Sequence, residues 1–244
     1  KLSDPSVYTW NAIISAHANL GQSERAIDLY NSLVKSDTRA NEYVYVAVLK
    51  ACTNMLAVTH GNLLFSCIIE DGLESDLFIC NTSMDMYAKC GGLGKAWEVL
   101  IELRVRNVVT WSTLIAGYTQ QGMGEEALKC FGLMRDESIS PDAITFSSIL
   151  KACGITRSLD KGIEIHDHIV DNGILQDNIV LNTALVDMYA KCGALQKAQK
   201  VFDGLSVRSV VLWNALITGY THLELCEDAL NCFHRMQSDG LSPD

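Results

Sequence analysis

The sequence predicts an all-α repeat protein, because short segments recur at a fixed spacing and apolar residues follow helical periodicity inside each recurrence. Trp10, Trp111 and Trp213 are separated by 101 and 102 residues. The segment LKAC at 49–52 recurs 101 residues later, and DMYAKCG at 85–91 recurs 102 residues later. Self-similarity of this kind indicates an array of stacked structural repeats.

Each long period divides into three units of unequal length. The unit 108–142 has 35 residues and the unit 77–107 has 31. We predict a single array over 1–244 with seven units: 7–41, 42–76, 77–107, 108–142, 143–178, 179–209 and 210–244. The pattern determines the boundary at 178/179 to within one residue.

Within a unit the pattern predicts two helices. In 108–142, Trp111, Leu114, Ile115 and Tyr118 fall at i, i+3, i+4 and i+7, which is one face of a helix. Gly122 then breaks the helical pattern, and the acidic residues that follow suit the first turn of a second helix. Because one such hairpin cannot bury its apolar faces alone, stacked hairpins form a solenoid.

Composition narrows the function. With 48% hydrophobic and 20% charged residues the chain is expected to fold. It has no run of 18 apolar residues, so we predict no membrane span. A net charge of −10 argues against affinity that rests mainly on phosphate neutralisation. The first residue is Lys1 and the repeat pattern continues to the last, so we expect a segment of a longer protein.

The chemistry-bearing residues do not form a catalytic or metal-binding pattern. None of the nine cysteines forms C-x-x-C, and most recur with the repeat, so we interpret them as small buried residues. His166 and His168 are two residues apart on a predicted helix and should face different neighbours. We therefore expect no metal, no cofactor and no enzymatic activity in this chain.

Two families of helical repeat have two-helix units of about 35 residues. The unit 108–142 carries several packing residues of the 34-residue tetratricopeptide repeat, but an alternation of 35 and 31 residues does not suit that array. The segments VVTWSTLIAGYTQQG, ITFSSILKAC and NTALVDMYAKCGALQKAQKVFD closely resemble the P-, L- and S-type units of plant pentatricopeptide repeat (PPR) proteins of the PLS subclass. The resemblance covers 7–244, in the order P-L-S-P-L-S-P, and implies a right-handed superhelical solenoid.

The resemblance also implies which residues contact RNA, since each PPR unit reads one base with two or three side chains. The fifth and last residues of a unit read the base, giving Asn11 with Asn41, Asn81 with Asn107, Ser112 with Asp142, Thr183 with Ser209, and Asn214 with Asp244. The L-type units would contribute more weakly through Val46 with Asp76, and Ser147 with Asp177 or Asn178. Second residues would flank the bases: Tyr8, Tyr43, Phe78, Val109, Ile144, Val180 and Val211.

The side-chain chemistry predicts a preferred sequence. An Asn carboxamide both donates and accepts, which suits a pyrimidine edge, whereas a short hydroxyl leaves room for a purine. A terminal Asp only accepts, which suits the N–H of uracil or guanine. With the family's parallel polarity the predicted RNA is roughly Y-n-Y-G-n-R-U, in which Val46 cannot read its base through its side chain.

The resemblance implies a plastid or mitochondrial RNA-recognition module that specifies a site for C-to-U editing or RNA processing. Any deaminase-like domain would lie C-terminal to the chain. A different class of function stays open: a protein-interaction scaffold, in which the L-type units dock editing cofactors or the array binds a peptide, with weak RNA binding. The acidic net charge favours that alternative.

Overall fold

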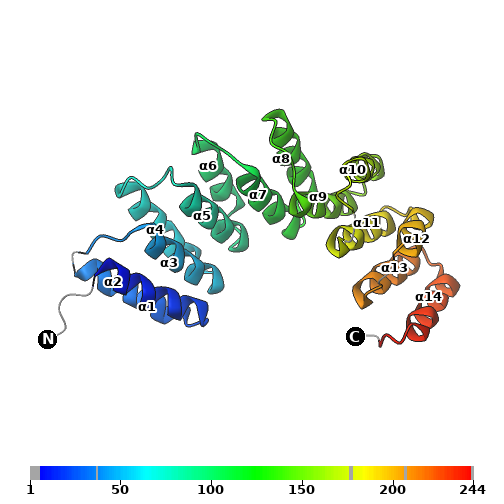
Figure 1. The fold of residues 1–244 in the computed structure, drawn as a ribbon, viewed down its shortest axis with the longest axis horizontal. Coiled ribbons are helices and arrows are strands. Elements are labelled where there is room, and N and C mark those ends of the chain that lie inside the picture. The colour runs from blue at the N-terminus through cyan, green and yellow to red at the C-terminus, as the bar shows by residue number, and fades with distance from the viewer. Residues whose placement is uncertain (1–5, 37, 176–177, 206–207, 243–244) are drawn as a thin grey trace. The chain divides into compact units, whose positions relative to one another are not determined.

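The computed structural model describes residues 6–36, 38–175, 178–205 and 208–242, and these form fourteen α-helices and no strand (Figure 1). None of these helices combines the length and the apolar character needed to cross a bilayer. The helices are α1 (Val7–Asn19), α2 (Ser23–Lys35), α3 (Glu42–Asn54), α4 (Val58–Glu70), α5 (Leu77–Lys89), α6 (Leu93–Glu102), α7 (Val108–Gln120), α8 (Gly124–Asp136), α9 (Ala143–Thr156), α10 (Leu159–Asp171), α11 (Ile179–Lys191), α12 (Leu195–Asp203), α13 (Val210–His222) and α14 (Cys226–Ser238).

Odd-numbered and even-numbered helices alternate as the first and second helices of successive hairpins. The first helices begin at Val7, Glu42, Leu77, Val108, Ala143, Ile179 and Val210, the residues at which the predicted units begin. The chain divides into an N-terminal body, Lys1–Gly117, and a C-terminal body, Tyr118–Asp244. Since this border lies inside α7, the single array over 1–244 stays a prediction.

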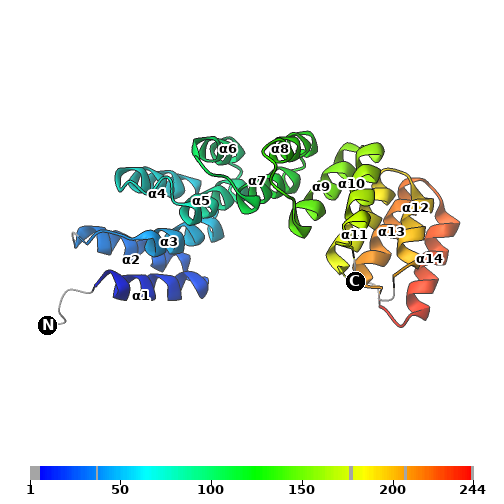
Figure 2. The same cartoon turned by 45° about the horizontal axis from the view of Figure 1, so that its top comes forward.

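Both bodies have the same layering. In the N-terminal body α1, α3 and α5 pack side by side, and α2 and α4 each contact the first helix of the next hairpin (Figure 2). In the C-terminal body α9, α11 and α13 pack in the same way, with α10 against α11 and α12 against α13. Each of these second helices therefore lies over the groove between two first helices.

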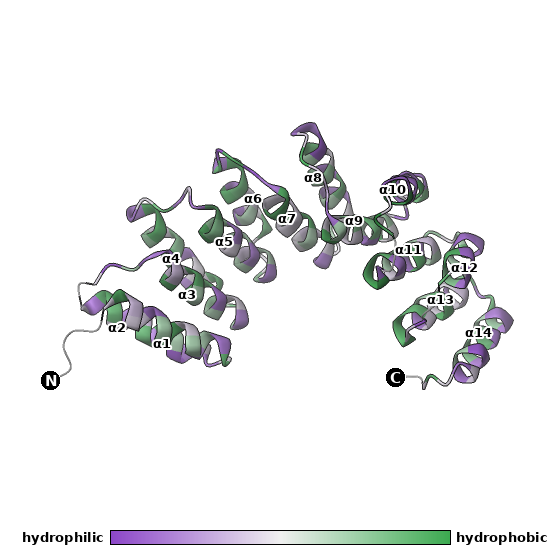
Figure 3. Cartoon of the chain, in the orientation of Figure 1, coloured by the Kyte–Doolittle hydropathy of each residue, from purple (hydrophilic) through white to green (hydrophobic). Residues whose placement is uncertain are grey.

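This layering explains why the first helices are apolar nearly all round. In α3, eight of thirteen residues are buried, including Val44 through Leu49 without a break. A helix buried on several sides has no continuous polar face. In α2 the buried residues form one stripe of Ala26, Ile27, Tyr30 and Leu33, and α10, α12 and α14 are largely hydrophilic (Figure 3).

Close approach between first helices depends on small residues at a repeated position. A Cβ atom on Gly219 of α13 would lie 2.6 Å from the Cβ of Ala190 on α11 and 2.9 Å from Leu195 Cδ2. The equivalent glycine of α7, Gly117, would meet the Cβ of Ala88 at the same 2.6 Å. A residue with a Cβ atom would clash at these two contacts, so glycine is required there.

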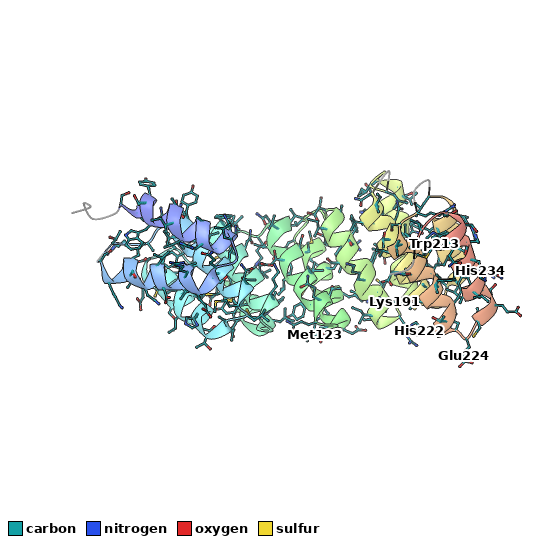
Figure 4. All side chains as sticks on the ribbon, turned by 90° about the horizontal axis from the view of Figure 1, so that it is seen from below. Met123, Lys191, Trp213, His222, Glu224 and His234 are labelled. Atoms are coloured by element: carbon teal, nitrogen blue, oxygen red, sulfur yellow. The ribbon has the colours of Figure 1, made fainter. Side chains whose placement is uncertain are left out.

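The turn inside each hairpin requires one residue in the left-handed region. Glycine occupies it in four hairpins, but Leu56 (φ 52°), Arg157 (φ 53°) and Glu224 (φ 59°) occupy it in the others. Figure 4 places Glu224 at the tip of its turn. A left-handed non-glycine residue costs roughly 1–2 kcal/mol, so three turns tolerate strain that glycine would remove.

We expect Gly219→Ala to lower the free energy of unfolding by about 1–3 kcal/mol, the usual cost of overpacking a tight contact. Gly132→Ala is the matched control, because a Cβ on this glycine of α8 has no atom within 4 Å. The control should be neutral or stabilise by up to about 1 kcal/mol through helix propensity. Urea unfolding followed by circular dichroism measures both, and equal effects would contradict the packing argument.

Candidate nucleic-acid interface

The first helices expose an apolar residue at one repeated position, although most of their other apolar residues are buried or half-buried. The second residue of each first helix is between 49% and 76% exposed. Single exposed apolar residues are ordinary, but recurrence at one helical position in every unit indicates a surface built for apolar contact. These residues are Tyr8, Tyr43, Phe78 and Val109 in the N-terminal body, and Ile144, Val180 and Val211 in the C-terminal body.

The predicted fifth-position residues differ in accessibility. Asn214 is exposed, and Asn11, Asn81 and Thr183 are half-buried. Val46, Ser112 and Ser147 are buried, with 4%, 7% and 6% of their surface exposed.

Local hydrogen bonds also occupy some of these side chains. Ser112 and Thr183 donate their hydroxyls to backbone carbonyls one turn earlier in their helices. Asn11 Oδ1 accepts a hydrogen bond of 3.1 Å from Ser15 Oγ. Asn81 Oδ1 is buried without a hydrogen-bond partner among the described residues. The carboxamide of Asn214 is therefore the most accessible group of this set.

The last residue of each described unit caps the first helix of the next one. Its side-chain oxygen accepts a hydrogen bond from a backbone N–H of the first turn, which would otherwise lack a partner. The bonds are Asn41 with Val44 N (3.1 Å), Asp76 with Phe78 N and Ile79 N (2.9 Å each), Asn107 with Thr110 N (3.1 Å), Asp142 with Thr145 N (2.8 Å), Asn178 with Leu181 N (3.1 Å) and Ser209 with Leu212 N (3.3 Å). Asp177 and Asp244 lie outside the described residues.

Asn, Asp or Ser directly before an apolar helix is the ordinary sequence signal of such a cap. Capping changes what these side chains offer a ligand. In Asn41, Asn107 and Asn178 one lone pair of the amide oxygen accepts the capping bond, which leaves the other lone pair and the Nδ2 donors. In Asp76 and Asp142 the capping bonds use Oδ1, which leaves Oδ2 as an acceptor.

The negative charge of the chain is not on the first helices. They carry four lysines against three acidic residues, although the whole chain has a net charge of −10. Two of the lysines are paired: Lys89 with Asp85 at 2.8 Å, and Lys191 with Asp187 at 2.7 Å. These i,i+4 pairs give the carboxylates of the DMYAKCG motif a local partner on their own helix.

The cysteines that recur with the repeat are buried or half-buried. Cys52, Cys130, Cys153 and Cys232 are buried, whereas Cys90 and Cys192 are only half-buried, contrary to the prediction of burial. Burial raises the pKa of the Cys52 thiol to about 11 and those of Cys130 and Cys153 to about 12, so these thiols stay protonated near neutral pH.

The two histidines of α10 face different helices, as predicted. His166 Nδ1 lies 2.8 Å from the Tyr189 hydroxyl of α11, while His168 packs on the ring of Phe146 of α9. Among the described residues, no three His, Cys, Asp or Glu side chains are grouped as a metal site.

We expect Asp142→Ala to lower the free energy of unfolding by about 1 kcal/mol, because α9 loses its cap. Asp142→Asn keeps the capping oxygen and should change stability by no more than a few tenths of a kcal/mol. Urea unfolding of both variants tests this assignment. An equal loss in the two variants would assign the effect to the charge instead of the cap.

Comparisons with known proteins place the chain in a family. The PPR repeat family model matches residues 5–54 and 106–154, and the PPR repeat model matches 78–108, 144–174, 183–210 and 211–241. A chloroplastic pentatricopeptide repeat-containing protein of Arabidopsis thaliana is 36% identical over 243 residues, which are 100% of this chain and 39% of the relative. A putative mitochondrial one is 33% identical over 239 residues, 98% of this chain and 38% of the relative.

A solved structure shares the fold. The pentatricopeptide repeat protein PPR10, in complex with an 18-nt psaJ RNA element, superposes with a TM-score of 0.85 at 22% identity, over 99% of this chain and 36% of that one. The chain spans about two fifths of the length of the two Arabidopsis relatives named above. On the family matches and the all-α repeat fold, the chain belongs to the pentatricopeptide repeat family.

Proposed function

We propose that this chain binds single-stranded RNA with one nucleotide per repeat. The observation that carries the proposal is the exposed apolar register at the second position of all seven first helices. One such side chain in each unit suits the faces of successive bases, and base stacking on protein side chains tolerates any sequence. The RNA-bound state of PPR10, a protein of the same fold, supports this choice of ligand.

Hydrogen bonds at the fifth and last positions would then select the bases. Asn214 offers an exposed carboxamide for the last base of the predicted Y-n-Y-G-n-R-U. The small side chain of Ser112 leaves room for a purine, and Asp142 Oδ2 is an acceptor suited to a guanine N–H. Asn41 and Asn107 keep Nδ2 as a donor after capping, which suits the carbonyl of a pyrimidine.

In the longer protein, the array would specify a site for organellar C-to-U editing or RNA processing, with recognition rather than catalysis as the task of this chain. The P-L-S-P-L-S-P order of the PLS subclass supports the editing assignment. The relatives whose names mark them as chloroplastic or mitochondrial support a plastid or mitochondrial location.

A second candidate function is protein docking on the second helices, with weak RNA binding. A cavity of about 630 Å³ lies between α8 and α10. Phe131 and Phe146 give it an aromatic wall, and the carboxylates of Asp167 and Asp171 line its rim. Such a cavity fits an editing-cofactor segment with apolar and basic residues better than it fits RNA.

Fluorescence anisotropy with a labelled YnYGnRU oligonucleotide and a scrambled one, at low salt, separates the two functions. Preferential binding of the YnYGnRU oligonucleotide supports RNA reading. Absence of binding to either oligonucleotide supports the docking function. Equal binding of both contradicts the base assignments.

We expect Asn214→Thr to move the preference at the last base from U toward G, by about fivefold in relative affinity, because one hydrogen bond is exchanged. Asn231→Thr is the matched control, since it makes the same change at an exposed position on the second helix of the same hairpin. Titrations with U-ended and G-ended oligonucleotides measure the shift. An unchanged preference in Asn214→Thr, or an equal shift in the control, would contradict the assignment.

A further inference from the structure

Besides the cavity between α8 and α10, the C-terminal body has a cavity of about 430 Å³ that is bordered by α10, α11 and α12. This volume lies in the range of small-molecule sites. None of the residues predicted to read or flank a base is among the described residues that line it. Each of the three helices contributes two polar side chains to the lining: His166, Asp167, Asn182, Tyr189, Lys197 and Lys200.

The amide of Asn182 lines this cavity without a hydrogen-bond partner. Asn182 is only 7% exposed, and its side chain has no hydrogen bond to any other described residue. Buried amides in proteins are almost always hydrogen-bonded, because an unpaired one loses the bonds that it makes in water. The side chain of Asn182 is therefore suited to bind a polar group inside the cavity.

The pair formed by His166 and Tyr189 offers a further donor. His166 Nδ1 lies 2.8 Å from the Tyr189 hydroxyl. Burial lowers the pKa of His166, so its ring is neutral near pH 7. A neutral imidazole has one N–H and a phenol has one O–H, and the bond between them uses only one of the two in either tautomer. One donor of the pair is therefore left for a ligand.

Two cations border the same space. Lys197 and Lys200 lie three residues apart on α12 and so share one face of the helix. Neither forms an ion pair with a described residue, and Lys197 Nζ lies 5.8 Å from the centroid of the Tyr189 ring. Asp167 is the one carboxylate among the described lining residues. With His166 neutral, two lysines against one aspartate leave a net positive charge.

The N-terminal body contains the same helices in the same register. Gly61 of α4 and Gly162 of α10 both approach the thioether of a methionine, Met86 and Met188 respectively. The residue four positions after each glycine packs on a tyrosine of the next first helix, and in α4 this residue is Phe65 instead of His166. A hydrocarbon ring thus suffices for packing at this position.

The other polar residues of the cavity also have substitutes in the N-terminal body. Cys80 is the fourth residue of α5, as Asn182 is of α11. Glu98 is the sixth residue of α6, as Lys200 is of α12, and it pairs with Lys95 at 2.6 Å. The repeat therefore folds without an amide or a surplus of positive charge here, so the polar lining in the C-terminal body is not a requirement of the fold.

We propose that this cavity binds a small phosphate monoester, with its phosphate at Lys197 and Lys200 and its organic part against Ile163 and Val201. A phosphate monoester carries nearly two negative charges at pH 7, which matches two lysines, and its oxygens accept from several donors at once. Ile163 and Val201 give the cavity apolar lining. The backbone phosphate of RNA carries one charge and continues on both sides, so it matches this enclosed set of donors less well.

Isothermal titration calorimetry of the whole chain at low salt tests the proposal with naphthyl phosphate as the probe. Naphthyl phosphate should bind at least about tenfold more tightly than inorganic phosphate or naphthol, because each of these supplies only part of the contacts. Naphthoate, which has a single charge and two oxygens, should bind at least about fivefold more weakly than naphthyl phosphate.

Lys200→Glu installs the residue of the N-terminal body and should weaken binding of naphthyl phosphate more than about tenfold, since repulsion replaces attraction. Lys161→Glu is the matched control, because it makes the same change at an exposed lysine of α10 that does not line the cavity. The control should change affinity less than about twofold. Asn182→Cys, which installs the residue found at Cys80, should weaken binding about fivefold through loss of the amide. Circular dichroism checks that all three variants fold.

Three outcomes would overturn the proposal: no binding of naphthyl phosphate, equally tight binding of naphthoate, or equal effects of Lys200→Glu and Lys161→Glu. Displacement of naphthyl phosphate by the YnYGnRU oligonucleotide would also overturn it, because the cavity would then bind RNA. Absence of displacement supports a site that is separate from the proposed RNA-binding surface.

Discussion

The structure depends on burial of the first helices by neighbours on several sides. A first helix has more apolar surface than the second helix of its own hairpin can cover, so α3 packs against α1 and α5, α11 packs against α9 and α13, and second helices cover a further side. Burial of one Leu or Ile side chain contributes about 1.5–3 kcal/mol, and α3 alone buries eight residues. The second residue of each first helix lies outside this packing and is exposed.

This arrangement also separates charge from the proposed binding surface. The first helices are nearly neutral, so the surplus of acidic residues is on second helices and connecting loops. A nearly neutral surface with exposed apolar side chains releases few counterions when RNA binds. On the proposed function, affinity would then come from base contacts, which is compatible with a pI near 5.0.

Much of the fold was predictable from sequence because the spacing of apolar residues along a helix determines which face of that helix is buried. The helices follow from apolar spacing such as that of Trp111, Leu114 and Ile115, all of which are buried. The left-handed residues Leu56 and Arg157 were not predictable, since neither residue type favours that conformation. Tertiary packing imposes it, because the second helix must reverse direction at that point in every hairpin.

The candidate site was predictable in register but less so in accessibility. Exposure of the second-position residues agrees with a flanking function, which stays a prediction until RNA binding is measured. Burial of Ser112 and Ser147 depends on how closely neighbouring helices approach, and no local pattern encodes that distance.

The capping bonds at the unit boundaries limit how specificity could evolve. A residue at the end of a unit must accept a hydrogen bond from the next helix whatever base it faces. Short side chains with an oxygen acceptor meet this demand, and large or aliphatic ones do not. On the proposed function, mutation at this position can therefore explore only a few residue types before the solenoid loses stability. The small set of side chains available for reading RNA would then be determined in part by the backbone of the protein itself.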